Sequence, residues 1–351
     1  MTSSERAGFR FGRRSCPTEI RWTHPLFPRR LIFVLSLAAV FAPTPLWART
    51  GYVFISNERS NTVTVIDPKK DDAIVKQVQT DWRPRDMHFN ADHSLLYVAC
   101  GDSDEIDAID VARLAVAGRI HTGRSPEIFL IGPDGKTFYV SEEESAIVRQ
   151  IDMNTGETLR QIATGPEPEG VIVNRDATKL YIASEVADMV HVADLKTGKV
   201  VKNILVDSRP RRFALTADGK ELWVSNELAG EVTVIDTATD AVKTTIDFLP
   251  PGMRTVDVTP VGITLSHDGK TMYVTLGHAN HVAFVDPATK KVEAYVLVGS
   301  RPWSVTETAD GRWLYVADGL SDDVSVVDVA ARKAVRSLAT GRVPHTVVID
   351  E

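Results

Sequence analysis

The sequence predicts an all-β protein built from one repeated unit, and three recurring residues carry this prediction. An aspartate recurs in steps of 43, 42, 42, 42, 50 and 42 residues, at Asp67, Asp110, Asp152, Asp194, Asp236, Asp286 and Asp328. An aromatic residue keeps the same period at Tyr97, Tyr139, Tyr181, Trp223, Tyr273 and Tyr315. A proline does so at Pro84, Pro126, Pro168, Pro210, Pro260, Pro302 and Pro344. Periods of about 40 to 45 residues with four strands each are typical of propeller blades, so we expect a seven-bladed β-propeller.

The segment from Lys220 to Asp236 represents the repeated unit. Residues 222–225 (LWVS) and 232–235 (VTVI) predict two strands, because aromatic and β-branched residues fit a pleated surface. The loop between them carries Asn226, Glu227 and Gly230. Asp236 opens a polar turn in which its carboxylate can accept backbone N–H groups.

Two further strands complete each blade. An inner strand follows the recurring proline, as in residues 212–215 (RFAL), and an outer strand precedes a Thr-Gly pair, as in residues 158–162 (TLRQI). Asp-Gly pairs such as Asp134-Gly135 separate the inner strand from the next. This dipeptide is a strong hairpin signal, and we expect a type I′ turn with positive φ.

The two ends of the repeat predict ring closure. Residues 52–55 (YVFI) read as a second strand without a first, and residues 345–349 (HTVVI) read as a first strand without a second. Together they can complete one blade. We therefore expect the last strand to pair with the first, which removes exposed sheet edges.

The first 48 residues lie outside the repeat and predict an export signal. Arg29-Arg30 precede the apolar run 31–42, and Ala48 is a small residue suited to cleavage. The run is shorter than the roughly 20 residues that a bilayer span needs. An uncleaved anchor is the alternative. We expect residues 1–48 to be a signal segment and residues 49–351 to be the propeller, located in the periplasm or cell envelope.

Charge and cysteine usage exclude several classes of partner. Without residues 1–48 the chain keeps 33 basic and 45 acidic residues, a net charge near −12. Because no basic patch remains, we expect neither nucleic acid nor an anionic membrane surface as a partner. Cys100 remains alone, so no disulfide can form within the mature chain, and it is expected to pack as a small hydrophobe. The absence of a C-x-x-C-H sequence argues against covalently attached haem.

The residue after each recurring proline differs from blade to blade and gives the candidate ligand site. These residues should form a ring at one mouth of the central channel, because the repeat places them equivalently. The candidate ligand-binding residues are Arg85, Glu127, Glu169, Arg211, Trp303 and His345, with Val261 at the seventh place. Such a ring could hold a small molecule with charged and apolar parts. Alternatively, the charges neutralise one another and cap a water-filled channel.

Loops on the same face are acidic. They include Asn57-Glu58, Asp102, Asp104-Glu105, Glu142-Glu143-Glu144, Glu185, Asn226-Glu227, Asp318 and Asp322-Asp323. Charge runs of this kind are usually solvated, so we interpret them as a solvated rim. A docking face for a basic protein, or a set of ligands for a divalent cation, remains open.

Two other features of this face are candidate sites. His278 and His281 lie three apart in one loop and could bind a metal, but no third ligand clusters with them in the sequence, so we assign no metal. Eight extra residues within 247–259 lengthen one loop, which could be a lid or a tolerated insertion.

The repeat resembles the YVTN-type β-propeller repeat family. The matching residues include 139–142 (YVSE), the V-x-V-I-D strands 63–67 and 232–236, and the T-G-x-x-P loops 122–126 and 164–168. More narrowly, the length, the seven blades, the export signal and the loop 56–61 (SNERSN) are similar to those of exported propellers associated with PQQ-dependent catabolism. This resemblance implies an accessory role in quinoprotein alcohol oxidation, with a quinoprotein dehydrogenase, a cytochrome or a small molecule as partner.

Two classes of function remain in competition. The first is a binding or accessory protein of the cell envelope without catalytic residues or a cofactor, which we favour. The second is an enzyme, because similar seven-bladed propellers include lactonases and d1-haem or quinone-linked oxidoreductases. A lactonase would need a metal or carboxylate cluster at the channel, for which Glu127, Glu169 and His345 are the candidates.

Overall fold

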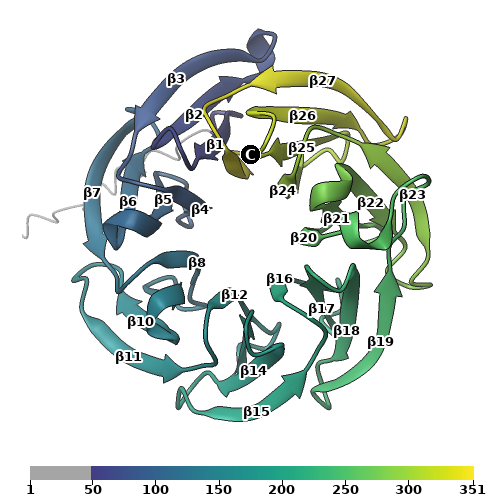
Figure 1. The fold of residues 1–351 in the computed structure, drawn as a ribbon. Helices are drawn as coiled ribbons and strands as arrows, with labels where there is room; N and C mark the ends of the chain where they lie inside the picture. Colours follow the sequence, from purple (N-terminus) through teal and green to yellow (C-terminus); the bar gives the residue numbers. More distant parts are fainter. Residues whose placement is uncertain (1–48) are drawn as a thin grey trace, which may run out of the picture. The chain divides into compact units, whose positions relative to one another are not determined.

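The computed structural model describes residues 49–351, which form seven four-stranded antiparallel sheets around a common centre (Figure 1). The predicted fold class is confirmed. The predicted signal segment, residues 1–48, lies outside the described residues and stays a prediction. None of the helices within residues 49–351 is long and apolar enough to cross a membrane.

Each blade consists of four strands in the predicted order. The inner strands are β4 (Pro84–Phe89), β8 (Pro126–Ile131), β12 (Pro168–Val173), β16 (Pro210–Leu215), β20 (Pro260–Leu265), β24 (Pro302–Glu307) and β28 (Pro344–Ile349). The second strands are β1 (Val53–Asn57), β5 (Leu95–Cys100), β9 (Thr137–Glu142), β13 (Lys179–Ser184), β17 (Glu221–Asn226), β21 (Met272–Leu276) and β25 (Trp313–Asp318). The third strands are β2 (Thr62–Asp67), β6 (Glu105–Asp110), β10 (Ile147–Asp152), β14 (Met189–Asp194), β18 (Glu231–Asp236), β22 (His281–Val285) and β26 (Asp323–Asp328). The outer strands are β3 (Ala73–Gln79), β7 (Ala115–His121), β11 (Thr158–Ala163), β15 (Val200–Leu205), β19 (Ala241–Asp247), β23 (Val292–Leu297) and β27 (Lys333–Ala339).

Short 3₁₀ turns interrupt some connections between strands. They are η1 (Pro68–Lys70), η2 (Gly101–Ser103), η3 (Glu143–Ser145), η4 (Thr255–Asp257) and η5 (Gly277–Ala279). The eight-residue insertion contains η4 and joins β19 to β20.

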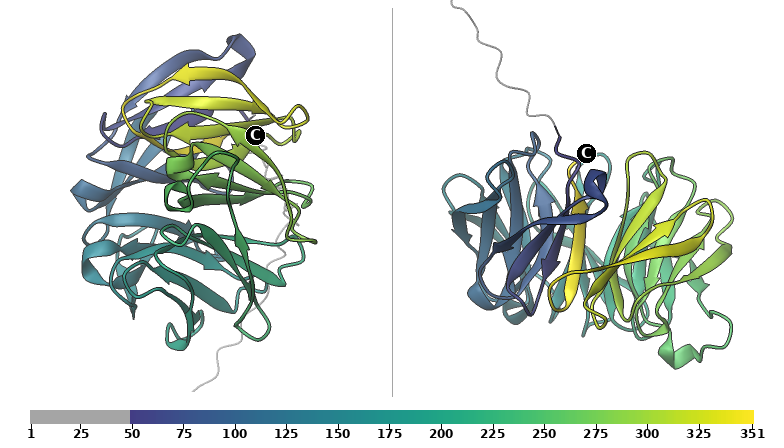
Figure 2. Two further views of the ribbon diagram at one scale, coloured as in Figure 1. Left: turned by 45° about the vertical axis from the view of Figure 1, so that its right-hand side comes forward. Right: turned by 90° about the horizontal axis from the view of Figure 1, so that it is seen from above.

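The chain ends close the ring as predicted. Strand β28 pairs antiparallel with β1, with Phe54 opposite Val348 and Ile55 opposite Val347. Figures 1 and 2 show yellow β28 beside the purple first strand. At the turn end, the Gly51 N–H donates to the Asp350 carbonyl at 2.9 Å. The last blade is therefore a four-stranded sheet like the others, assembled from both ends of the sequence.

The apolar core lies between neighbouring blades. The recurring aromatics Tyr97, Tyr139, Tyr181, Trp223, Tyr273 and Tyr315 are each no more than 6% exposed. Trp223, for example, packs in a cluster that joins its own blade to Met272 and Val274 of the next. Burying one large side chain stabilises a fold by about 1.5 to 3 kcal/mol, so these interfaces supply much of the stability.

The Asp-Gly hairpins form, but the predicted type I′ turn is wrong. A type I′ turn needs positive φ at both central residues, whereas Gly135 has φ +65° and Asp134 is not in the left-handed region. The Gly135 N–H donates to the Gly132 carbonyl at 2.8 Å, so a type I turn is followed by a left-handed residue. His93 and Ala177 hold the same place in two blades without a glycine, at φ +59° and +56°.

A β-bulge follows the recurring proline in every blade. In the β4–β5 pair, Pro84 lies opposite Cys100 and Met87 opposite Val98, so the inner strand holds one extra residue. The other six inner strands show a register shift at the same place. Bulges re-aim side chains, so residues on either side of the shift can turn toward the channel.

Candidate functional site

The structure brings the predicted ring residues together at the start of the inner strands. Arg85, Glu127, Glu169, Arg211, Val261 and His345 are all buried, each no more than 6% exposed, and Trp303 is half-buried. The ring therefore forms as the repeat predicts, but its side chains pack against one another rather than line an open mouth. Whether they contact a ligand stays a prediction.

Ion pairs join the ring across four blades. The Arg85 guanidinium lies 2.8 Å from a Glu127 carboxylate oxygen and 3.7 Å from one of Glu169. Arg211 reaches the same Glu169 oxygen at 3.3 Å. Arg212, the next residue of β16, is 2.8 Å from it. One carboxylate of β12 thus contacts guanidinium groups from the adjacent inner strand β16 and from β4, two blades away.

A second layer of arginines lies beside the ring. These are the residues before three of the prolines, Arg83, Arg209 and Arg301, and all three have left-handed φ near +60°. Arg83 contacts Glu127 at 2.9 Å, and Arg301 contacts Glu227 at 2.6 Å. A non-glycine residue in this conformation costs on the order of 1 kcal/mol or more, so the loops hold these guanidinium groups in place at some expense of backbone stability.

The interpretation of the acidic loops as a solvated rim is wrong in part. Glu142, Glu185, Glu227 and Asp318 are each no more than 5% exposed. Asn57 and Asn226 are also fully buried. Glu185 contacts Arg209 at 2.8 Å and is also paired with Arg211. Asp102 and Glu144, by contrast, are more than half exposed and do belong to the rim.

The two ring carboxylates are in different electrostatic environments. Burial raises the pKa of Glu169, but Arg211, Arg212 and Arg85 outweigh this and lower it to about 2. Burial raises the pKa of Glu127 to about 8, helped by the neighbouring Glu169 charge and opposed by Arg85. At neutral pH Glu169 is therefore ionised, while burial acts against the ionised form of Glu127 and its contacts with Arg83 and Arg85 act in favour of it.

His345 is neutral, and its tautomer follows from its neighbours. Burial, followed by Arg85 and Arg212, lowers its pKa well below the usual value. Its Nε2 lies 3.2 Å from Arg85 Nη2, and a guanidinium can only donate, so Nε2 must accept. The proton is then on Nδ1, which donates to Thr346 Oγ1 at 3.0 Å. The Trp303 indole packs beside the His345 imidazole, with 5.5 Å between the two centroids.

A cavity of about 460 Å³ occupies the channel next to the ring. Arg212, Trp303 and His345 line one end of it. Farther along, its walls come mainly from apolar inner-strand residues such as Ile172 and Val348. Arg212 could not be predicted from the sequence, because strict alternation would turn the neighbour of Arg211 away from the channel, and the bulge changes that direction.

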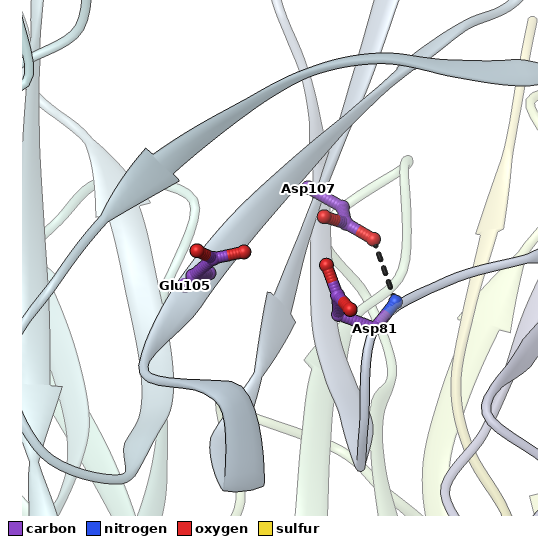
Figure 3. Close-up of side chains that lie close together, drawn as sticks. All are labelled: Asp81, Glu105 and Asp107. Atoms are coloured by element: carbon purple, nitrogen blue, oxygen red, sulfur yellow. Dashed lines mark hydrogen bonds between the residues drawn. The ribbon is translucent and has the colours of Figure 1, made fainter.

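Three carboxylates outside the channel also cluster. Asp81, Glu105 and Asp107 place candidate ligand oxygens within 4.8 Å of one another (Figure 3). The Asp81 N–H donates to Asp107 at 2.8 Å. The Arg119 Nε lies 3.3 Å from Asp107 and 3.6 Å from Glu105, and it also pairs with Asp81. A guanidinium thus occupies the position where a cation would neutralise the cluster.

The sequence contains a signal for this cluster. Asp81 stands where the matching loops carry Gly123 and Gly165. Asp107 lies beneath that loop, where His191 accepts the Gly165 N–H in another blade. The Asp107 carboxylate therefore has a structural role as a backbone acceptor.

The remaining candidates make ordinary local contacts. His281 Nδ1 donates to the Ala279 carbonyl at 2.6 Å. Neither His281 nor His278 joins a group of three candidate metal ligands within residues 49–351. Cys100 is fully buried in an apolar cluster, as predicted, and burial raises the pKa of its thiol.

Comparison with known proteins places the chain in a β-propeller family. The sequence matches the family model described as YNCE-like beta-propeller over residues 41–261, more than half of the chain. It matches the model described as Lactonase, 7-bladed beta-propeller over residues 202–349. A search of curated proteins returns no match.

Solved structures share the fold. Hydrazine synthase from Kuenenia stuttgartiensis is 23% identical, with a TM-score of 0.72, covering 84% of this chain and 99% of that one. The periplasmic gluconolactonase PpgL from Pseudomonas aeruginosa is 19% identical, with a TM-score of 0.71 and coverage of 86% and 99%. The dihydro-heme d1 dehydrogenase NirN is 15% identical, with a TM-score of 0.66 and coverage of 85% and 75%. At these identities the likeness concerns the fold alone.

Proposed function

The chain belongs to the YNCE-like β-propeller family, and we propose that it is an exported binding protein that holds a small molecule in its central channel without turnover of its own. The cavity beside the charged ring carries this proposal. Its volume of about 460 Å³ falls within the range of ligand pockets, roughly 300 to 1,000 Å³. Apolar walls with a few polar groups at one end are typical of such pockets.

The state of the polar groups favours binding over catalysis. A general base needs a lone pair that can reach the substrate and a pKa near the working pH. Glu169 is held ionised by three guanidinium groups, with a pKa of about 2. The Nε2 lone pair of His345 accepts from Arg85, and the pKa of this histidine lies well below its usual value. Neither group has the properties of a proton acceptor for a reaction at neutral pH.

Export and an accessory role in quinoprotein alcohol oxidation belong to the same proposal. The signal-like segment 1–48 and the resemblance to propellers of PQQ-dependent catabolism support it. A quinoprotein dehydrogenase or a cytochrome is then the partner protein. A deletion strain should grow poorly on an alcohol and normally on a non-alcohol carbon source. Equal growth on both sources would contradict the accessory role, and recovery of residues 1–30 in envelope-extracted protein would contradict cleavage.

A lactonase-type hydrolase is the second candidate, and two observations favour it. The lactonase family model matches residues 202–349, and a solved structure with the same fold is named a gluconolactonase. Glu127, with its pKa raised to about 8, would be a protonated acid at neutral pH. A d1-haem or quinone-linked oxidoreductase has only the fold similarity to NirN in its favour.

Lactone hydrolysis by the pure protein separates the two candidates. The binding proposal expects no hydrolysis of gluconolactone above the buffer rate. Hydrolysis that is lost in Glu127→Gln and Glu169→Gln, but kept in the exposed control Glu144→Gln, would assign the protein to the enzyme class. Circular dichroism should accompany each variant, because both ring carboxylates also hold arginines in place.

A further inference from the structure

The cavity is closed at the proline end of the inner strands and accessible from the Asp-Gly turn end. Exposure of the inner strands rises in that direction. The ring residues are no more than 6% exposed, apart from half-buried Trp303, whereas the His88 side chain, three positions farther along β4, is 43% exposed. Ile131 and Val173, at the ends of β8 and β12, are half-buried and line the same cavity. The second layer, including Arg83 and Arg209, lies beyond the closed end.

The walls between the two ends are mostly apolar. Leu130, Ile172, Phe213 and Val348 face the cavity from four different blades. The hydroxyl of Thr264, another wall residue, already donates to the Val305 carbonyl at 2.8 Å. A molecule in this channel therefore meets hydrocarbon along most of its length. Because burial of apolar surface is favourable, the channel favours a ligand with an apolar body.

The closed end presents a donor whose acceptor is shared. Arg212 reaches Glu169 at 2.8 Å, but that carboxylate is also within 3.3 Å of Arg211 and 3.7 Å of Arg85. Arg212 and Trp303 both line the cavity, but the Trp303 Nε1 is buried against Gly319, which is not part of the lining. A carboxylate arriving there would accept from the Arg212 guanidinium in a charge-assisted hydrogen bond.

The pKa values of two buried groups indicate a positive potential at the closed end of the cavity. Besides burial, Arg85 and Arg212 lower the pKa of His345, which resists taking a proton. Arg211 and Arg212 lower the pKa of Glu169 to about 2 against the effect of burial. The other carboxylate facing the cavity, Asp86, already accepts from His88 at 3.0 Å and from a backbone N–H at 3.1 Å. The cavity end therefore favours negative charge.

We propose that the cavity binds an organic anion, a carboxylate on an extended apolar body, which enters from the Asp-Gly turn face and places its carboxylate against Arg212. This assignment rests on the proposed binding function and adds the ligand class and the direction of access. The residues expected to contact the ligand are then those that line the cavity, not the buried ring residues beside it.

Calorimetric titration of the purified protein with a matched series tests the ligand class. Octanoate, octanol and acetate separate the anion with its apolar body from the body alone and the charge alone. Octanoate should bind at least about tenfold more tightly than octanol, which lacks the charge, and than acetate, which lacks the apolar body. Equal binding of octanol would overturn the anion assignment while leaving the binding function intact. Failure of octanoate to bind would overturn the inference.

Substitution of Arg212 connects the affinity to this residue. Arg212→Gln should weaken octanoate at least about tenfold and leave octanol unchanged, and Arg212→Lys should recover part of the loss. Arg124→Gln is the control, since Arg124 is an exposed arginine on the loop face with a 74% exposed side chain. An unchanged affinity in folded Arg212→Gln would contradict the site. If Arg212→Gln does not fold, Arg212→Lys decides. Its affinity for octanoate relative to octanol should lie below that of wild type, and an unchanged ratio would contradict the site.

Association rates test the direction of access. Val173→Trp narrows the turn end and should slow octanoate association by at least about tenfold, whereas Arg124→Trp on the loop face should not. The opposite pattern would overturn access from the turn face but keep the ligand class. Lactone hydrolysis by the same preparation would instead contradict the proposed function itself, so the two failures are distinguishable.

Discussion

At the residue scale, Asp318 shows how one repeated position can carry a pH response. It is fully buried, and burial raises the pKa of its carboxyl to about 7. One oxygen accepts the Ser325 N–H at 3.1 Å, and the other has no hydrogen-bond partner among residues 49–351. Two other blades hold Asn57 and Asn226 at the equivalent place. Those amides donate to a threonine hydroxyl of the neighbouring strand, so an uncharged side chain suits this position.

Asp318→Asn should therefore remove part of the pH dependence of stability. An aspartate with an unfolded pKa near 3.9 and a folded pKa of about 7 binds its proton more tightly when folded. Its contribution is fully present below the unfolded pKa and is lost as pH rises through about 7. The wild-type free energy of unfolding should thus decline from pH 5 to pH 8. The free energy of unfolding of the variant should decline less over the same interval, and the two declines should differ by about 2 to 4 kcal/mol. Urea unfolding at both pH values measures this.

The control for Asp318 is Asp102→Asn on the same face, where the side chain is 53% exposed. It should leave the pH profile of unfolding unchanged. Parallel profiles for wild type and Asp318→Asn would show that the buried aspartate keeps its unfolded pKa, contrary to the argument.

The left-handed hairpin residues give a second prediction at this scale. Ala177 is exposed and has φ +56°, in a turn where other blades place glycine. Ala177→Gly should stabilise the fold by about 0.5 to 1 kcal/mol, because glycine adopts this conformation without steric cost. Gly135→Ala, the reverse change at φ +65°, should destabilise it. Thermal melting checks both, and two changes of the same sign would contradict the turn argument.

At the element scale, hydroxyl groups of four second strands, those of Ser56, Ser141, Ser225 and Thr275, tie the inner strand of one blade to that of the next. Ser225 of β17 donates to the Val261 carbonyl of β20 at 2.7 Å and accepts the Arg212 N–H at 3.1 Å. Ser56 donates to the Arg85 carbonyl at 2.6 Å in the same manner. The small hydroxyl residue of the Y-V-S pattern therefore fixes the backbone at the ring and explains why this residue type recurs.

Ser225→Ala should cost about 1 to 3 kcal/mol of stability, because a buried carbonyl and a buried N–H both lose their partner. Ser225→Thr is the matched control, since Thr275 holds the equivalent place and accepts the Gly262 N–H at 2.7 Å. The threonine variant should keep most of the stability in urea unfolding. An alanine variant as stable as wild type would mean that the bridge contributes nothing.

The same scale explains what the sequence could and could not predict. Strand order and the ring position follow from spacing alone, because Pro84 and its six equivalents repeat with the strands. The partners of the ring were not predictable in this way. Arg209 meets Glu227, which belongs to a different loop, and Arg212 turns into the channel only because of a bulge. The repeated Arg-Pro pairs at Arg83, Arg209 and Arg301 were a usable signal for the second layer.

At the scale of the whole molecule, stability depends on closing the ring with a strand from the far end of the chain. Strand β28 completes the sheet of β1, β2 and β3, and its Val347 is 1% exposed. Without it, β1 loses a hydrogen-bonded neighbour and the ring gains two open flanks. The sequence predicted this from an incomplete unit at each end, whereas the hydrogen bond between Arg85 and neutral His345 is visible only in three dimensions.

Deletion of residues 345–351 should therefore destabilise the propeller strongly. Three buried or half-buried apolar residues, Val347, Val348 and Ile349, leave the core, at about 1.5 to 3 kcal/mol each. For a domain of this size the melting temperature should fall by roughly 10 °C or more.

A circular permutant is the control, with a short linker from residue 351 to residue 49 and new ends at exposed Gly252. The Gly51 N–H and the Asp350 carbonyl are only 2.9 Å apart, so this linker need not strain the closing blade. The permutant should melt close to wild type, since it keeps every strand. A truncated protein that melts within two degrees of the permutant would show that closure contributes little to the fold.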